Sequence, residues 1–214
     1  MLELNKIHHW DCLELMKLIP DKSIDLVLTD PPYWIGIKWK VGGGKLAKVK
    51  DYWDFNDRDN EIPSKEYFDE ILRISKNAII FWGNYFIENL SNSSCWIVRD
   101  KNNSGNFADC ELARTNFNTA VRIYKYTWNG MIQEDMSNKE VRHHPTQKPI
   151  QLFKWILENY SEPWMTICDP FLWSWTTAIA CKELWRNFIG IEKEKKYVDI
   201  ANKRLATTTV SLFN

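Results

Sequence analysis

A short apolar run that ends in a carboxylate and two prolines constrains this chain more than any other feature. Residues 24–29 are leucine-rich and β-branched, which is typical of a buried strand. The strand must end at Asp30-Pro31-Pro32-Tyr33, because each proline fixes its own φ and pushes the preceding residue out of the α region. We therefore predict that Asp30 and Tyr33 lie at the carboxyl edge of a sheet, where open α/β sheets bind ligands.

This tetrad contains the groups needed to hold an amino group on a flat base. The carboxylate of Asp30 and a proline carbonyl can accept the two N–H bonds, and the Tyr33 ring can stack on the face of the base. The same residues would also suit a strand that simply ends in a Pro-Pro turn with a surface tyrosine. Other segments of the chain have to decide between these interpretations.

Strand and helix patterns alternate along the rest of the chain, and we find no internal repeat or low-complexity tract. This alternation predicts an α/β fold with a doubly wound, largely parallel sheet in a single domain. We predict further strands at 77–81, 95–98, 120–128, 165–168 and 188–191, and helices at 11–18, 64–75, 150–160, 176–184 and 197–205.

Composition limits how the chain could meet a nucleic acid. Its 214 residues suit one α/β domain, and the formal net charge is zero, so attraction to DNA would depend on local patches. The loop after the first strand offers one patch, which would lie beside the predicted site or else form only a solvated loop. The lysines of that patch are Lys38, Lys40, Lys45, Lys48 and Lys50.

The cysteine spacing and the lengths of the apolar segments predict the compartment of the protein and whether it binds a metal. Five cysteines are scattered without C-x-x-C spacing, which predicts free thiols in a reducing cytosol and no zinc site. His143-His144 has no cluster of further ligands, so we predict no metal. We see no signal peptide and no long apolar span, and we expect a cytoplasmic protein.

Two downstream segments decide how the Asp-Pro-Pro-Tyr tetrad is interpreted. Residues 144–149 read His-Pro-Thr-Gln-Lys-Pro, and residues 165–172 read Met-Thr-Ile-Cys-Asp-Pro-Phe-Leu, followed by Thr-Thr-Ala at 176–178. With these segments the chain resembles the DNA amino-methyltransferases that use S-adenosylmethionine, in the permuted order called the β group. The resemblance runs from Asp11 to about Leu205.

The resemblance implies a Rossmann-like methyltransferase fold over residues 1–214. It divides the chain into a target-base half at 11–90, a possible small recognition region at 91–143 and a cofactor half at 144–205. Asp30, Pro31 and Pro32 would hold the target amino nitrogen, and Tyr33 would stack on a flipped base. The residues that would bind the cofactor are Asp11, Cys12, Thr146, Lys148, Asp169, Phe171, Trp173, Trp175, Thr176 and Glu192.

The chain departs from the family pattern at its glycines. The family's cofactor loop reads D-P-F-x-G-x-G-T, but Trp173 and Trp175 stand at both glycine positions here. Composition agrees, because the chain has 12 Trp and only 8 Gly. A glycine at such a turn supplies φ > 0 or close approach to a ligand, so a tryptophan should strain the loop or fill the cavity. The replacement recurs at Trp10, Trp34, Trp82, Trp164 and Trp185.

The resemblance therefore implies a site-specific methyltransferase for N6 of adenine in double-stranded DNA, of the restriction-modification type. The Asp of the tetrad favours adenine, because relatives with Ser in its place mostly methylate N4 of cytosine. The alternatives are a cofactor-deficient DNA-binding or inactive-subunit relative, and a methyltransferase that acts on N4 of cytosine or on RNA. Little of the chain is left for target recognition, so a homodimer or a partner subunit could supply part of it.

Overall fold

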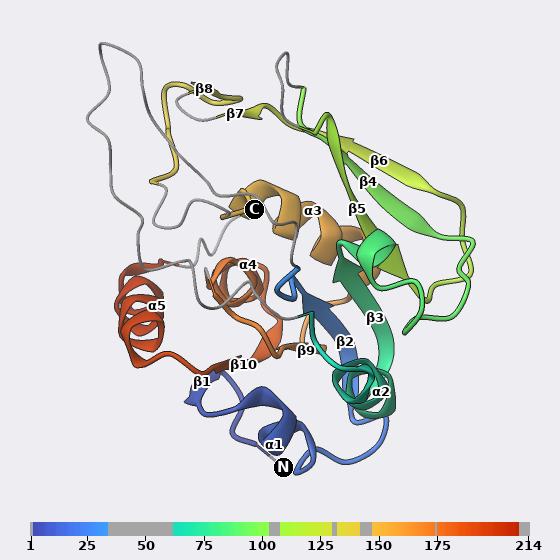
Figure 1. The fold of residues 1–214 in the computed structure, drawn as a ribbon. Coiled ribbons are helices and arrows are strands. Elements are labelled where there is room, and N and C mark those ends of the chain that lie inside the picture. The colour runs from blue at the N-terminus through green and yellow to red at the C-terminus, as the bar shows by residue number, and fades with distance from the viewer. Residues whose placement is uncertain are drawn as a thin grey trace.

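The structure is a computed structural model that describes residues 2–33, 62–102, 108–129, 132–141, 147–173 and 175–209. Its centre is an eight-stranded mixed sheet in the order β1-β10-β9-β2-β3-β5-β4-β6 (Figure 1). These strands are β1 (Lys6–His9), β2 (Ile24–Thr29), β3 (Ser75–Phe81), β4 (Trp96–Asp100), β5 (Cys110–Thr115), β6 (Arg122–Lys125), β9 (Thr166–Asp169) and β10 (Asn187–Glu192). A small hairpin, β7 (Trp128–Asn129) and β8 (Ile132–Gln133), lies outside that sheet.

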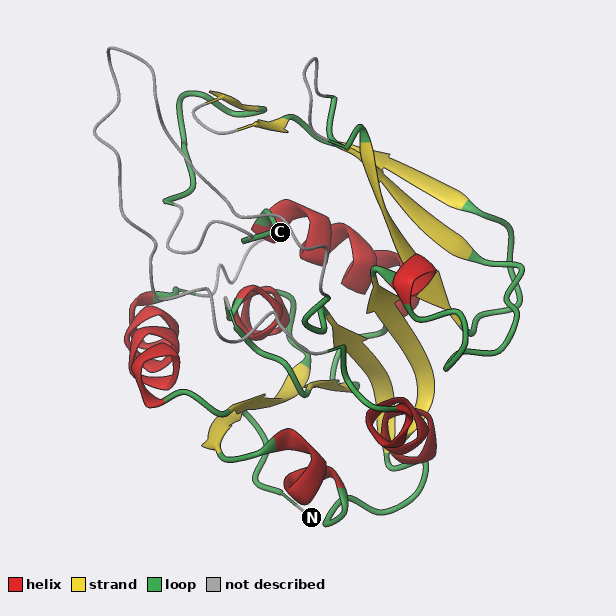
Figure 2. Cartoon of the chain, in the orientation of Figure 1, coloured by secondary structure: helices red, strands yellow, loops and turns green. Residues whose placement is uncertain are grey.

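Helices cover both faces of the sheet (Figures 1 and 2). They are α1 (Cys12–Met16), α2 (Lys65–Ile74), α3 (Ile150–Tyr160), α4 (Thr176–Glu183) and α5 (Lys195–Thr207), with a short 3₁₀ turn, η2, at Gly83–Tyr85. One buried cluster joins α1 and α2 to the sheet through Met16, Phe68 and Ile71. The other joins α3, α4 and α5 to the opposite face, for example through Phe153 and Ala178. The predicted α/β fold with a doubly wound sheet is confirmed.

The parallel part of the sheet positions a ligand site. β1, β10, β9, β2 and β3 run parallel, whereas β5 is antiparallel to both of its neighbours, β3 and β4. After β2 the chain continues to α2 on one face, and after β9 it continues to α4 on the other face. The boundary between β2 and β9 is therefore a topological switch point, where open α/β sheets form a crevice at the carboxyl ends of the strands.

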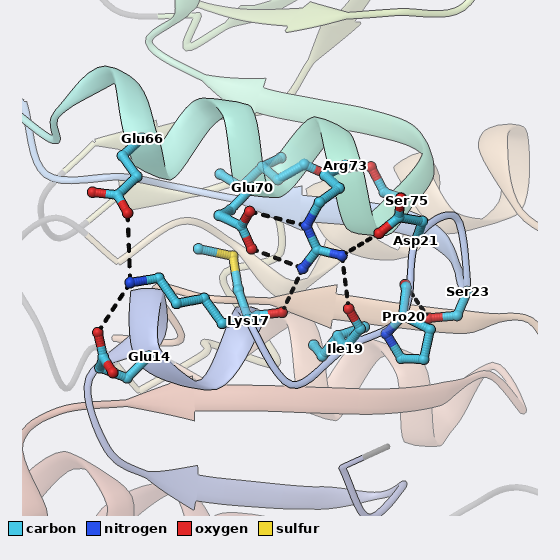
Figure 3. Close-up of polar contacts among 12 residues, drawn as sticks. Glu14, Lys17, Ile19, Pro20, Asp21, Ser23, Glu66, Glu70, Arg73 and Ser75 are labelled. Carbon is cyan, nitrogen blue, oxygen red and sulfur yellow. Dashed lines mark hydrogen bonds and ion pairs between the residues drawn. The ribbon is translucent and has the colours of Figure 1, made fainter.

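Asp11 determines where α1 begins. Its side chain accepts hydrogen bonds from Leu13 N at 3.0 Å and Glu14 N at 3.4 Å, so it caps the N-terminus of the helix. The carbonyl end of this segment is satisfied by Arg73 of α2, which donates to Met16 O at 2.9 Å and to Ile19 O at 3.0 Å (Figure 3). Arg73 thus joins α2 to the turn between α1 and β2.

Some strands differ from the sequence-based predictions. β1 and β5 were not predicted, and the strand predicted at 120–128 is wrong in extent, because β6 ends at Lys125 and β7 belongs to the hairpin. β5 carries Glu111 and Arg114 within its buried pattern, which obscures the apolar alternation that marks a strand. In the part of the chain that the structure describes, no helix is long and apolar enough to cross a membrane.

Candidate active site

Acidic residues stand at the carboxyl ends of three neighbouring parallel strands. Asp30 directly follows β2, Asp169 is the last residue of β9, and Glu192 is the last residue of β10. Because parallel strands end at the same edge, the fold brings together three residues that the sequence analysis selected from distant segments. Thr29 Oγ1 donates to Asp169 Oδ1 at 2.8 Å and so joins the two strands at the switch point.

The two carboxylate oxygens of Asp30 differ in their contacts with the described residues. Lys148 Nζ forms an ion pair with Asp30 Oδ2, and the lysine is almost completely buried. Asp30 Oδ1 is also buried, but it has no hydrogen-bond partner among the described residues. Burial raises the pKa of the Asp30 carboxyl above its ordinary value, and the charge of Lys148 opposes that rise. The site therefore holds a desolvated acceptor that receives no hydrogen bond from the described part of the chain.

A buried charge cluster lies behind this pair. Arg99 and Glu111 are cross-strand neighbours on β4 and β5, and Arg99 Nη1 lies 2.6 Å from Glu111 Oε2. Lys101 Nζ lies 2.9 Å from the other carboxylate oxygen. Burial acts to raise the pKa of Glu111, but Arg99, Lys148 and Lys101 outweigh it and lower this pKa to about 2. The sequence analysis assigned these residues no chemistry, although charged side chains inside strand patterns were a visible signal.

Several aromatic rings contact one another near Lys148, the ion-pair partner of Asp30. The Tyr33 ring centroid lies 5.6 Å from that of Tyr85 in a stacked arrangement and 4.1 Å from that of Trp82. The ammonium of Lys148 lies over two rings, 4.5 Å from the Phe81 centroid and 5.4 Å from the Trp82 centroid. The position of Tyr33 suits a residue that stacks on a flat base, but the Trp82 ring already lies against it.

Asp169 holds the loop between β9 and α4 together. Besides the bond from Thr29, it accepts hydrogen bonds from Thr177 Oγ1 at 2.5 Å and from Phe171 N at 3.2 Å. Leu172 N donates to Ile191 O at 3.0 Å, which fastens the same loop to β10. Burial raises the pKa of Asp169 to about 6, although the two threonine hydroxyls lower it.

The raised pKa of Asp169 predicts a pH-dependent stability. Between pH about 4 and 6 the folded protein keeps a proton that the unfolded chain has released, so the free energy of unfolding falls as pH rises through this window. Asp169→Asn should remove this loss, which amounts to about 3 kcal/mol. Denaturant unfolding of both proteins at pH 4, 5, 6 and 7 measures the difference.

A second variant tests whether Asp169 is the titrating group. Thr177→Val removes a hydroxyl that stabilises the carboxylate, so it should extend the window of falling stability above pH about 6. A stability difference between wild type and Asp169→Asn that does not change with pH would contradict the assignment.

Asp11 and Cys12 lie at the start of α1, close to the end of β10. Lys193 Nζ, one residue beyond β10, lies 3.5 Å from Asp11 Oδ2. Burial, followed by the charge of Asp11, raises the pKa of the Cys12 thiol to about 12, and the charge of Glu192 adds a smaller effect. Cys12 is therefore a neutral thiol next to the strand edge rather than a nucleophile.

The other predicted cofactor residues lie along the loop after β9. Phe171 packs against Tyr67 with ring centroids 5.7 Å apart, and Thr176 is buried at the start of α4. Trp173 is partly buried in this loop. Trp175 has a left-handed backbone with φ 53°, and its buried ring lies under Arg204 of α5. The predicted strain is thus present at one of the two tryptophans.

Several predicted residues lie outside the described ranges. They are Thr146, His143-His144, Trp34 and the loop lysines Lys38, Lys40, Lys45, Lys48 and Lys50. All five cysteines are free thiols. Within the described ranges, no group of three or more histidine, cysteine or acidic side chains could hold a metal ion.

The fold and this edge define the class of protein, which is a Rossmann-like α/β domain with a candidate ligand site at its topological switch point. Residues 94–203 match the family model described as DNA methylase, whose members are N6 and N4 amino-methyltransferases. The chain belongs to this family.

Similar proteins and solved structures support this family assignment. The chain is 29% identical to the type II methyltransferase M.HinfI of Haemophilus influenzae, over 94% of this chain and 68% of that protein. The structure resembles M1.HpyAVI in complex with S-adenosylmethionine, with 26% identity, a TM-score of 0.57 and coverage of 94% of this chain and 98% of that one. It shares its fold with the cytosine-N4-specific PvuII DNA methyltransferase, with 16% identity, a TM-score of 0.63 and coverage of 96% and 87%.

Proposed function

We propose that this protein transfers a methyl group from S-adenosylmethionine to N6 of adenine in double-stranded DNA. The observation that carries the proposal is the buried Asp30 Oδ1, which accepts no hydrogen bond from the described residues and lies three positions before Tyr33 in the chain. An exocyclic amino group supplies the missing N–H, and a base stacked on Tyr33 would present that group to it. The similarity to M.HinfI and to the S-adenosylmethionine complex of M1.HpyAVI supports the reaction class.

The tetrad makes the amine a better nucleophile. The lone pair of an adenine amino group is delocalised into the ring, so the nitrogen is planar and weakly nucleophilic. Hydrogen bonds to Asp30 Oδ1 and to the Pro31 carbonyl favour a tetrahedral nitrogen and localise the pair. The charge of Lys148 favours the ionised carboxylate and so opposes the rise in the Asp30 pKa that burial causes. Asp30 need not be a strong base, because the proton can leave after the methyl group arrives. Positioning and electrostatics supply most of the rate.

The cofactor would lie across the ends of β9 and β10. Glu192, buried at the end of β10, has the chemistry to accept the two ribose hydroxyls, and the Asp11-Cys12 segment would meet the adenine ring. S-adenosylmethionine supplies an electrophilic methyl group on a sulfonium. The donor and acceptor types at this edge fit the group, whereas the strained backbone at Trp175 does not favour it.

The choice of adenine rests on the tetrad. A carboxylate at position 30 is typical of relatives that methylate adenine N6, and serine is typical of those that methylate cytosine N4. The family model includes both reactions, and the likeness to the PvuII enzyme concerns the fold alone.

DNA contacts are proposed for the lysine-rich segment at 38–50, and target selection for the region at 91–143, alone or with a second subunit.

Calorimetric titration of S-adenosylhomocysteine into the purified protein tests whether the protein binds the cofactor. Saturable binding, followed by N6-methyladenine in DNA incubated with S-adenosylmethionine, would support it. Binding without any methylated base would contradict it.

In protein that binds S-adenosylhomocysteine, Glu192→Gln should weaken binding about 10–100-fold. The substitution removes the charge from the acceptor of two hydroxyl hydrogen bonds, and such charged bonds contribute about 1.5–3 kcal/mol. The exposed Glu158→Gln on α3 is the matched control and should leave the affinity unchanged. Equal affinities for the Glu192→Gln variant and its parent would remove Glu192 from the ribose site.

A second candidate function is a DNA-binding or partner subunit that has lost the cofactor. The left-handed backbone at Trp175 favours it, because this residue is the N-cap of α4, at the end of the proposed cofactor loop. This candidate predicts that the folded chain binds no S-adenosylhomocysteine and that Trp173→Gly combined with Trp175→Gly restores binding. If the double variant bound no better than its parent, the tryptophans would not be the obstacle.

A further inference from the structure

Most of the described non-glycine residues with a left-handed backbone conformation are tryptophans. Seven described non-glycine residues have positive φ, and four of them are tryptophans. The other three are Asn5, Lys22 and Asn102. Asparagine tolerates this conformation, but for a bulky side chain it is an outlier. The φ values are 58° at Trp82, 69° at Trp164, 53° at Trp175 and 61° at Trp185.

Trp164 occupies the glycine position of a type II turn. Met165 N donates to Glu162 O at 3.3 Å, which closes a four-residue turn whose second residue is Pro163. Proline at the second position and φ > 0 at the third are the features of a type II turn, and the third position is normally glycine. The Trp164 side chain is 69% exposed, so no burial of the ring offsets the strained backbone.

Trp185 occupies the glycine position at a helix end. It follows the C-cap Leu184 of α4, and Arg186 N reaches back to Cys181 O at 2.9 Å. This bond is the long hydrogen bond of a Schellman motif, in which the residue after the C-cap is left-handed and usually glycine. The Trp185 side chain is 43% exposed and packs loosely on Trp164, with ring centroids 5.9 Å apart.

Trp82 and Trp175 begin the helical turns at the two halves of the candidate site. Trp82 is the left-handed residue before η2, and Trp175 is the left-handed residue before α4. The Trp82 indole Nε1 is buried with no hydrogen-bond partner among the described residues, and the ring lies 4.1 Å from that of Tyr33. An indole with an unsatisfied N–H therefore takes up space beside the residue proposed to stack on the target base.

The two glycines in the described ranges allow close packing rather than a left-handed backbone. Neither Gly83 nor Gly190 has a left-handed φ; an added Cβ would lie 2.4 Å from Arg114 Cβ at the first and 2.6 Å from Leu172 Cδ2 at the second. They permit close approach of neighbouring groups. Within the described ranges, no glycine occupies a left-handed position, and tryptophan occupies four of the seven such positions.

We propose that positions 82, 164, 175 and 185 carry glycine in the functional protein, because the cell that makes it decodes the codon at these positions as glycine rather than tryptophan. One codon can produce this pattern: UGA is read as tryptophan in some genetic codes and as glycine in others. On this proposal the tryptophans within helices and strands are encoded by the ordinary codon UGG and stay tryptophan. The inference rests on backbone geometry and holds whether or not the proposed methyl transfer is correct.

Mass spectrometry of peptides from the protein isolated from its source cells tests the decoding directly. Glycine at the four positions is expected, together with tryptophan at Trp128, whose indole Nε1 donates to Gln147 O at 3.0 Å in the core. Tryptophan at all four positions in the native protein would overturn the proposal.

Recombinant variants test the geometry separately. Trp164→Gly and Trp185→Gly should each raise Tm by about 2–4 °C, because glycine relieves the left-handed strain and the lost rings are largely exposed. Trp164→Ala and Trp185→Ala are the matched controls. They remove the same rings but keep Cβ, so they should give little of this gain. Equal Tm values for the glycine and alanine variants would contradict a backbone built for glycine.

Discussion

Replacing Asp30 by alanine should lower methyl transfer about 10²–10⁴-fold while the protein stays folded. Asp30 Oδ1 is the buried acceptor proposed to hold the amino nitrogen, and Oδ2 is held by Lys148. Removing a preorganised hydrogen-bond partner of the reacting group typically costs this much in rate. The measurement is single-turnover methyl transfer to DNA in protein that binds the cofactor, with Tm recorded in parallel.

Asp30→Ala should also affect stability through Lys148. Asp30→Ala also leaves Lys148 buried without its carboxylate, so some loss of stability is expected, and Lys148→Met in the same background should recover it. The exposed Asp199→Ala on α5 is the control and should change neither rate nor Tm appreciably. Substantial transfer by folded Asp30→Ala protein would exclude Asp30 from the reaction.

The second large effect is expected from the charge cluster behind the site. Arg99→Met leaves the Glu111 carboxylate buried without its main partner, and breaking such a pair costs about 3–5 kcal/mol. For a domain of this size that corresponds to a fall in Tm of about 6–20 °C. Thermal unfolding measures it. Lys101 and Lys148 retain some attraction for Glu111, which places the expected value toward the lower end.

A second substitution separates the charge from the packing. Arg99→Met combined with Glu111→Met removes both charges, so it should be more stable than Arg99→Met alone. Lys195→Met on α5 breaks an exposed pair with Asp199 and should cost no more than about 1 kcal/mol. If the double variant were less stable than Arg99→Met, packing of the side chains rather than the unpaired charge would explain the loss.

The parts of the site that local sequence determines could be predicted. Two prolines fix the end of β2, so Asp30 and Tyr33 could be placed at a strand edge before the structure was known. Asp169 and Glu192 also follow short apolar runs, and parallel strands bring such residues to the same edge. The alternation of strands and helices was sufficient to predict the doubly wound sheet.

The rest depended on pairings between distant residues. Arg99 meets Glu111 only because β4 and β5 pair in that register, and β5 was not predicted. The resemblance placed Lys148 among the cofactor residues but gave no sign of its ion pair with Asp30, which lies more than half the chain away in sequence. The left-handed φ of four tryptophans could be suspected from the scarcity of glycine, but only the backbone identifies the turns.

Analysis of the methylated nucleosides in DNA treated with S-adenosylmethionine tests the central claim most directly. Both the tryptophan-containing protein and the variant with Trp82→Gly, Trp164→Gly, Trp175→Gly and Trp185→Gly are assayed, so that a blocked loop and a wrong assignment give different results. We predict N6-methyladenine as the product, with more product from the variant. N4-methylcytosine, or no methylated base from a protein that binds both S-adenosylhomocysteine and DNA, would contradict the account.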